Sequence, residues 1–456
     1  MSSSSAVERL GTEKIWKLLL EMSSQTTFSL LVYAIYSITD TYFLSVGINS
    51  LAAAGASIIS PVLMALGGVA TIVGVGGASI VSRALGEKNI ERASRTVANT
   101  FLIFWMVAIT ITIFGALLIE PIVYVLGATD RIAPYAIEYG RIIFLGAITS
   151  TGFSAIIRAD GSSRFSTAIW VIPVLVNTVL CWLFIIVLHL GAAGAALATV
   201  TGQAVSAGMS IYFFFFRKPC SYQIEAAYFK PDKAIIGEVL LIGLPSFLKS
   251  ISASLVMIVT NNLLKLIGGD SALGVFAIIS RLYVALSLPQ TGIVQGMQPL
   301  VGYNFGQKRF ERVRKTVTLS LAATIIYGLL VCSLCLLIPT TLISLLSREN
   351  TIITEGQVAL GLLSLSYPLS GVALSVATYF QAVGKAKQAL FLTLGSILLV
   401  KLPVLLLAST LFALNGIWAA EALSELILCT AAILMLRNYQ GKVAATESLA
   451  YDPPIL

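Results

Sequence analysis

The chain has 456 residues, of which 57% are hydrophobic and only 11% are charged, whereas a soluble domain carries about a quarter charged residues. Together with a mean hydropathy of +0.92, this composition excludes an ordinary soluble fold and points to an integral membrane protein. The single histidine, His189, excludes a histidine-based metal cluster and a Ser-His-Asp catalytic triad.

Twelve apolar runs, each long enough for a helix to cross a bilayer core, follow one another along the chain. They lie near residues 14–46, 53–82, 97–118, 132–157, 165–188, 192–216, 235–266, 273–302, 316–338, 355–382, 388–413 and 416–437. The runs lack the two-residue alternation of a transmembrane barrel, so we predict an all-α integral membrane fold with twelve transmembrane helices. The polar first 13 residues contain no short apolar core with a cleavage site, and we expect no removable signal peptide.

Basic residues fall in alternate connections between these runs. If the N-terminus is inside, the inner connections hold nearly all of the lysine and arginine, and the clear exceptions outside are Arg131 and Arg348. This positive-inside bias predicts that both termini are cytoplasmic. It also accounts for the net charge of +8 without any nucleic-acid partner.

A repeat shows how the twelve runs are organised. Residues 81–97, VSRALGEKNIERASRTV, return 220 positions later as residues 301–317, VGYNFGQKRFERVRKTV. Six runs precede the polar midpoint of the chain and six follow it, so both halves have the same orientation in the membrane. We therefore predict two six-helix lobes around a central cavity. The predicted domains are an N-lobe (1–216), a cytoplasmic linker (217–234), a C-lobe (235–437) and a cytoplasmic tail (438–456).

Asp40 is a carboxylate inside the first run, with no basic residue near it in sequence. A charge at bilayer depth costs about 2.5–3.5 kcal/mol on insertion scales, and it is therefore functional by default. Such a group binds a cation, holds a proton or pairs with a distant base; the alternative is a structural hydrogen bond or a wet, shallow position. Polar groups on its own and later helices could complete an oxygen-rich site for H⁺ or Na⁺: Tyr36, Asn177, Cys181 and Thr199.

The second half carries a mixed set of charges in its apolar runs: Lys249, Arg281, Lys401, Glu421 and Glu425. Opposite charges within one bundle are expected to pair, and Lys401 could meet either glutamate. We interpret this set as the wall of a C-lobe cavity or a second coupling site, with a purely structural role as the alternative.

The chain resembles the multidrug and toxic compound extrusion (MATE) transporters over essentially its whole length. The resemblance rests on ITDTYFLSVG in the first run, LGEKN after the second, GLPSF opening the seventh and QGMQPLVGYNFGQK ending the eighth. The pattern is similar to the branch that contains DNA-damage-inducible protein F and staphylococcal multidrug exporters. It implies twelve helices in two lobes and export coupled to H⁺ or Na⁺.

The resemblance also assigns roles to residues in the first half. Asp40, Asn177 and Thr199 match family positions that hold the proton or a Na⁺ ion, and Tyr36 matches the tyrosine one turn before the aspartate. Cys181 stands where the family has a second aspartate, which puts a two-carboxylate ion site in doubt.

We therefore predict a cation-coupled antiporter and not an enzyme. It would export amphipathic, cationic drugs or one natural product of its host, and would need no bound cofactor. We expect a monomer in a bacterial inner membrane, with a small-molecule substrate and membrane lipid as partners. A lipid-linked oligosaccharide flippase remains an alternative because Lys249, Arg281 and Lys401 could bind pyrophosphate; a membrane enzyme is a weaker one.

Overall fold

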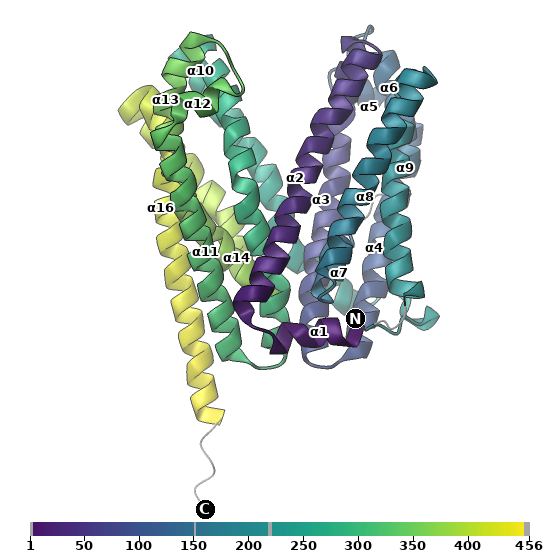
Figure 1. Ribbon diagram of the computed structural model, residues 1–456, viewed down its shortest axis with the longest axis vertical. Coiled ribbons are helices and arrows are strands. Elements are labelled where there is room, and N and C mark those ends of the chain that lie inside the picture. Colours follow the sequence, from purple (N-terminus) through teal and green to yellow (C-terminus); the bar gives the residue numbers. More distant parts are fainter. Residues whose placement is uncertain (1–2, 150–151, 218–220, 451–456) are drawn as a thin grey trace, which may run out of the picture. The chain divides into compact units, whose positions relative to one another are not determined.

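The computed structural model describes residues 3–149, 152–217 and 221–450, and within these ranges it consists of helices and short connections and contains no strand. In these ranges, each of the twelve predicted runs coincides with one or more helices (Figure 1). The first half contains α1 (Ser3–Thr12), α2 (Ile15–Gly47), α3 (Ser50–Gly86), α4 (Ile90–Leu117), α5 (Ile119–Val125), α6 (Ala133–Leu145), η1 (Gly146–Thr149), α7 (Ser154–Ala159), α8 (Ser163–Cys181), η2 (Trp182–Val187), α9 (Gly191–Ile211) and η3 (Tyr212–Phe216).

The second half begins after the short η4 (Ala226–Tyr228). It contains α10 (Lys233–Gly306), α11 (Phe310–Leu337), α12 (Pro339–Ser344), α13 (Asn350–Ser364), α14 (Tyr367–Ala382), α15 (Ala386–Leu390), η5 (Phe391–Gly395), η6 (Ile397–Lys401) and α16 (Leu402–Ala450). Among the described residues, eight helical stretches, or nine with the bent pair α13 and α14, are long and apolar enough to cross a membrane.

Two of these stretches each hold two of the predicted runs. α10 is interrupted at Gly269, whose φ is 64°, and α16 is interrupted at Ala413, whose φ is 47°. A positive φ cannot continue a right-handed helix, so each of these residues ends one membrane helix and starts the next. Within the described ranges, nine stretches, two of them divided, give eleven membrane helices, and α9, which holds the sixth run, gives the twelfth. The prediction of an all-α fold with twelve membrane helices is confirmed.

The chain separates into two compact units. Unit 1 contains Met1–Phe247, Gln295–Thr316 and Gln381–Gly384, and unit 2 contains Leu248–Val294, Val317–Phe380 and Lys385–Leu456. The lobe and linker boundaries given above remain predictions, and the linker and tail include residues 218–220 and 451–456, which lie outside the described part.

Each unit has its own apolar core. In unit 1 the core joins α2, α3, α5, α6, α8 and α9, with Ile59 and Val123 fully buried. In unit 2 it joins α10 to α14 and α16, with Leu264 and Tyr367 fully buried. In Figure 1 the helices α2, α3, α8 and α9 of unit 1 run side by side, as their packing contacts require. Apolar side chains elsewhere on the helices face outward, as expected in lipid.

The repeated stretches 81–97 and 301–317 form the same local structure twice. α3 and α10 end at equivalent positions of the repeat, and α4 and α11 begin at equivalent positions. Between them, Lys88 and Lys308 both take the left-handed conformation, with φ of 59° and 57°. The sequence identity between the two copies therefore reflects one turn geometry used twice.

The two copies also pack against each other within unit 1. A β-carbon on Gly86 would overlap the carbonyl oxygen of Tyr303, and one on Gly306 would overlap the carbonyl oxygen of Arg83. Because 83 and 303, like 86 and 306, differ by 220, these contacts are reciprocal, as in an interface with two-fold symmetry. Glycine is needed at both positions because the two backbones touch there.

A further pair of contacts obeys the same symmetry. Arg158 Nη1 donates a hydrogen bond to Thr26 Oγ1 at 2.8 Å. At the equivalent place in the second copy, Gln381 Nε2 donates to Ser246 Oγ at 2.9 Å. The first copy therefore uses a buried cation for a hydrogen bond that the second copy makes with a neutral amide.

Candidate ion-binding site

Unit 1 brings together the five polar side chains predicted in the first half. Asp40 lies on α2 one turn after Tyr36, and α2 packs against α8. Asn177 and Cys181 are four residues apart on α8 and therefore share a face. α8 in turn packs against α9, which carries Thr199. α2 and the later pair α8 and α9, which is distant from α2 in sequence, thus place these groups at one point.

A chain of close polar contacts links the five side chains. The Cys181 thiol faces Asp40 Oδ1 at 3.6 Å and Asn177 Oδ1 at 3.7 Å. Asn177 Nδ2 lies 3.4 Å from Thr199 Oγ1, and the Tyr36 hydroxyl lies at the same distance from that oxygen. The carboxylate is thus connected through a thiol and an amide to two hydroxyl groups.

In the part of the chain that the structure describes, the site carries one negative charge and no neighbouring positive one. Among the described residues no lysine or arginine forms an ion pair with Asp40, which is only partly exposed. Asn177 and Thr199 are each 3% exposed, and Cys181 is completely buried. An isolated, partly buried carboxylate is stabilised by binding a proton or a cation, and the carboxylate, amide and hydroxyl oxygens are ligands that a hard cation prefers.

Tyr139 on α6 joins this cluster and was not identified from the sequence. Its hydroxyl shares a hydrogen bond with Thr199 and interacts electrostatically with Asp40, and the residue is 2% exposed. Tyr139 and Cys181 both belong to the apolar core of unit 1. No sequence signal distinguishes Tyr139 from the other tyrosines in apolar runs, because its role depends on how α6 packs against α9.

The helix that carries Asn177 and Cys181 changes its geometry at the site. α8 ends at Cys181, and the π-helical η2 begins at the next residue. The equivalent helix of the second half also contains π-helical segments, η5 and η6, and η6 ends at Lys401. Wider turns of this kind are rare and are frequent at functional sites.

Unit 2 contains a second polar cluster, built around Lys401. Lys401 Nζ lies 2.6 Å from Glu421 Oε1 and 2.8 Å from Glu425 Oε1, so both of the pairings considered from the sequence are present. The Tyr283 hydroxyl donates to the same Glu421 oxygen at 3.5 Å. The second oxygen of Glu425, Oε2, is buried and has no hydrogen-bond partner among the described residues.

The other two predicted cationic residues stand apart from this cluster. Lys249 is exposed and interacts with Lys401 and the two glutamates electrostatically, without a direct contact. Arg281 is exposed and makes no hydrogen bond or ion pair within the described part of the chain. The structure therefore brings Lys401, Glu421 and Glu425 together and leaves Arg281 outside.

Another buried acid lies in the turn between α7 and α8, outside the membrane spans. Asp160 is completely buried, and its Oδ1 has no hydrogen-bond partner among the described residues. Burial disfavours the charged form and raises the pKa of Asp160 to about 7, although the nearby Ser221, a hydrogen bond from Ser162 and the charge of Arg217 act in the opposite direction. This carboxyl group was not predicted as a site.

Comparison with known proteins decides the family. A model of the MatE family matches residues 26–183 and 245–407, which is most of the chain. The chain belongs to the MATE family. The multidrug export protein MepA of Staphylococcus saprophyticus is 26% identical to this MATE protein over 449 residues, which cover 95% of this chain and 96% of that protein. MepA of Staphylococcus haemolyticus is 24% identical over 439 residues, with the same coverage.

Solved structures agree with this MATE fold. A MATE protein crystallised in the bent conformation has a TM-score of 0.90 and 23% identity, covering 97% of this chain and 99% of that chain. The outward-facing conformation of a multidrug resistance MATE transporter of the MOP superfamily has a TM-score of 0.88 and 22% identity, covering 96% and 98%. The chain is therefore a multi-pass membrane protein of a multidrug efflux family, and a transporter of small molecules rather than an enzyme.

Proposed function

We propose that this MATE protein is an antiporter that couples the inward movement of H⁺ or Na⁺ to the export of amphipathic, cationic small molecules. The observation that carries the proposal is the cluster at Asp40, where a carboxylate without a basic partner is linked through Cys181 and Asn177 to Thr199. We place the protein in a bacterial inner membrane, as a monomer with both termini in the cytoplasm, because basic residues concentrate in the connections on that side.

In this mechanism the cation binds from outside, where its electrochemical potential is higher. Neutralising Asp40 changes its contacts with α8, and the repacked helices release the substrate outward. Return to the inward-facing state then discharges the ion into the cytoplasm. A potential of 100 mV supplies about 2.3 kcal/mol per charge, enough for roughly fifty-fold accumulation because 1.4 kcal/mol is a factor of ten.

The site has the donors that such an ion requires. Asp40 supplies the charge, and the side-chain oxygens of Asn177 and Thr199 supply neutral ligands within the same contact chain. The hydroxyls of Tyr36 and Tyr139 complete its polar surroundings. A single carboxylate favours either a proton or a monovalent cation over a divalent one, because a divalent ion would retain uncompensated charge in an apolar surrounding.

The cluster of Lys401, Glu421 and Glu425 argues against the flippase alternative. A pyrophosphate group would need uncompensated cations, whereas Lys401 is in contact with two carboxylates. We propose that this cluster forms a cavity wall whose charges compensate one another.

Export from everted membrane vesicles tests the function. Vesicles containing the wild-type protein are expected to accumulate ethidium when a gradient is imposed, and vesicles containing Asp40→Asn are not. Asp130→Asn is the matched control, because Asp130 is exposed in the same unit. Deletion of the gene would also distinguish the alternatives: drug hypersensitivity supports export, whereas loss of envelope polymer without hypersensitivity would indicate a flippase.

A further inference from the structure

A cavity of about 400 Å³ lies within unit 2, between the two helices of α10 that meet at Gly269. This volume is in the range of sites for small molecules. One wall is formed by Met257, Asn261 and Lys265, which are four residues apart and share a helix face. The other wall comes from the helix after Gly269.

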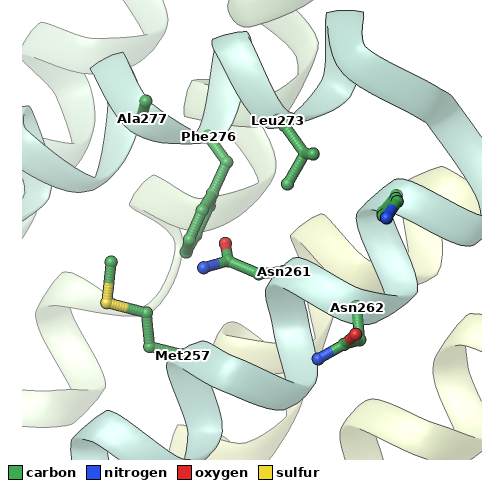
Figure 2. Close-up of a pocket in the computed structure, with 7 residues that line it drawn as sticks. Met257, Asn261, Asn262, Leu273, Phe276 and Ala277 are labelled. Carbon is green, nitrogen blue, oxygen red and sulfur yellow. The ribbon is translucent and has the colours of Figure 1, made fainter. Parts of the chain in front are cut away.

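That second wall is apolar and packs against a buried tryptophan. It contains Leu273, Phe276 and Ala277. The Phe276 ring stacks on the buried Trp418, with ring centroids 6.2 Å apart. Figure 2 shows the amide of Asn261 beside the ring of Phe276, with the side chain of Met257 nearby. The cavity therefore presents polar groups on one wall and an apolar surface on the other.

Two of its polar groups have no partner among the described residues. Asn262 Nδ2 donates to the carbonyl oxygen of Ile258 at 2.8 Å and is thereby occupied. Neither Asn261 nor Lys265 makes a side-chain hydrogen bond or an ion pair within the described part of the chain. The residues that line the cavity include one lysine and no acid, so an anionic ligand group would be complementary to it.

The sequence repeat shows that the charge at this cavity is opposite in sign to the charge at the equivalent place in the first half. Asn261 aligns with Asp40 when one gap is allowed, and Lys265 follows it by one turn. Where unit 1 has an isolated negative charge, unit 2 thus has a neutral amide and a positive charge. From Met257 to Lys265 the helix rises by about 12 Å, which separates the charged end of the cavity from an apolar end.

We propose that this cavity binds an amphipathic molecule with a single anionic head group, a carboxylate or a phosphate. The head group lies at Lys265 and accepts a hydrogen bond from the Asn261 amide, and the apolar part packs against Phe276. Two sources have this chemistry: a free anionic amphipath and an anionic membrane lipid. The inference is independent of cation coupling, so it stands whether or not Asp40 binds the driving ion.

Binding of a fluorescent fatty acid to the full-length protein in nanodiscs of neutral lipid tests the proposal. The probe is 11-(dansylamino)undecanoic acid, and its methyl ester has the same shape without the charge. Trp418 stacks on the wall of the cavity, but the chain has five tryptophans. The part of the energy-transfer signal that Trp418→Phe removes therefore reports binding at this cavity. We expect the acid to bind about tenfold more tightly than the ester, since a charged hydrogen bond contributes about one power of ten.

Substitutions test whether the difference in affinity between the acid and its ester arises at this cavity. Lys265→Gln is expected to abolish the preference for the acid, Lys265→Arg to retain it, and Asn261→Leu to reduce it. Lys387→Gln is the matched control, since Lys387 is an exposed lysine of unit 2 that does not line the cavity. Equal binding of acid and ester by the wild type, or an unchanged preference in Lys265→Gln, would overturn the proposal.

The source of the ligand is decided by repeating the titration with phosphatidylglycerol in the nanodisc. If the anionic lipid leaves acid binding unchanged, the site takes a free amphipath. If the lipid displaces the acid from the wild type and has no effect in Lys265→Gln, the site takes a lipid head group. Either result supports an anion-selective site, whereas displacement that is independent of Lys265 contradicts it.

Discussion

Removing Lys401 is expected to destabilise the protein far more than removing either acid that contacts it. The cluster contains one cation and two carboxylates, which lie 2.6 and 2.8 Å from the same nitrogen. The side chains of Lys401, Glu421 and Glu425 are 18%, 23% and 7% exposed, so solvent screens their charges only in part. Lys401→Met leaves two neighbouring carboxylates without the cation that contacts them, whereas Glu421→Gln leaves a neutral ion pair.

The magnitude follows from this charge arrangement. Removing one partner of a buried ion pair typically costs about 3–5 kcal/mol, because the remaining charge stays buried. We expect a loss in this range for Lys401→Met. We expect a change within about 1 kcal/mol for Glu421→Gln, because removal of one acid also removes the repulsion between the two carboxylates. The triple variant Lys401→Met/Glu421→Gln/Glu425→Gln is expected to recover most of the loss.

The order of stability of these variants is measured by their thermal unfolding midpoints. The purified variants are heated in one detergent at a single scan rate, and unfolding is monitored by intrinsic fluorescence. Lys401→Arg is the control that retains the charge, and its unfolding midpoint is expected to be near that of the wild type. Equal midpoints for Lys401→Met and Glu421→Gln would refute the electrostatic reasoning. So would a triple variant that unfolds as early as Lys401→Met, since the loss would then come from packing.

Three further predictions concern unit 1. Cys181→Asp places a second carboxylate beside Asp40, so we expect tighter binding of Na⁺, measured with ²²Na⁺; unchanged binding would show that the thiol position does not face the ion. Because the pKa of Asp160 is raised to about 7, the wild type loses stability as the pH rises from about 4 to about 7, and Asp160→Asn does not. At pH 8 the variant is expected to be more stable by up to about 4 kcal/mol; pH-independent midpoints would contradict this. Arg158→Gln retains the donor to Thr26 and removes a buried charge, so it is expected to unfold at no lower temperature than the wild type. Arg158→Ala is expected to lower the free energy of unfolding by about 1–3 kcal/mol, because it also removes the donor. Equal losses of stability in the two variants would show that the charge itself is needed.

The sequence predicted the elements of the fold because membrane helices are specified locally. Each run is long and apolar enough to be recognised without knowledge of its neighbours, and the repeat at 81–97 and 301–317 indicates a duplication through residue identities alone. The short helices α5 and α12 were not predicted, because seven and six residues give too little periodicity to recognise.

The candidate sites were predictable only where a single residue is anomalous in its run. Asp40 and Lys401 are charges in apolar surroundings, and the cost of placing them there marks them individually. Tyr139 and Tyr283 carry no such mark, since tyrosine is ordinary in membrane helices, and only packing brings them to the polar clusters. The cavity at Asn261 depends on the approach of two helices across Gly269, which no pattern within either helix specifies.

Transport driven separately by a proton gradient and by a sodium gradient tests the central claim most directly. Proteoliposomes with the purified protein are loaded with ethidium, and either ΔpH or ΔNa⁺ is imposed alone. The wild type and Asp130→Asn are expected to transport ethidium with at least one of the two gradients, and Asp40→Asn with neither. Transport by Asp40→Asn at the wild-type rate, under the same gradient, would contradict the assignment of ion coupling to Asp40.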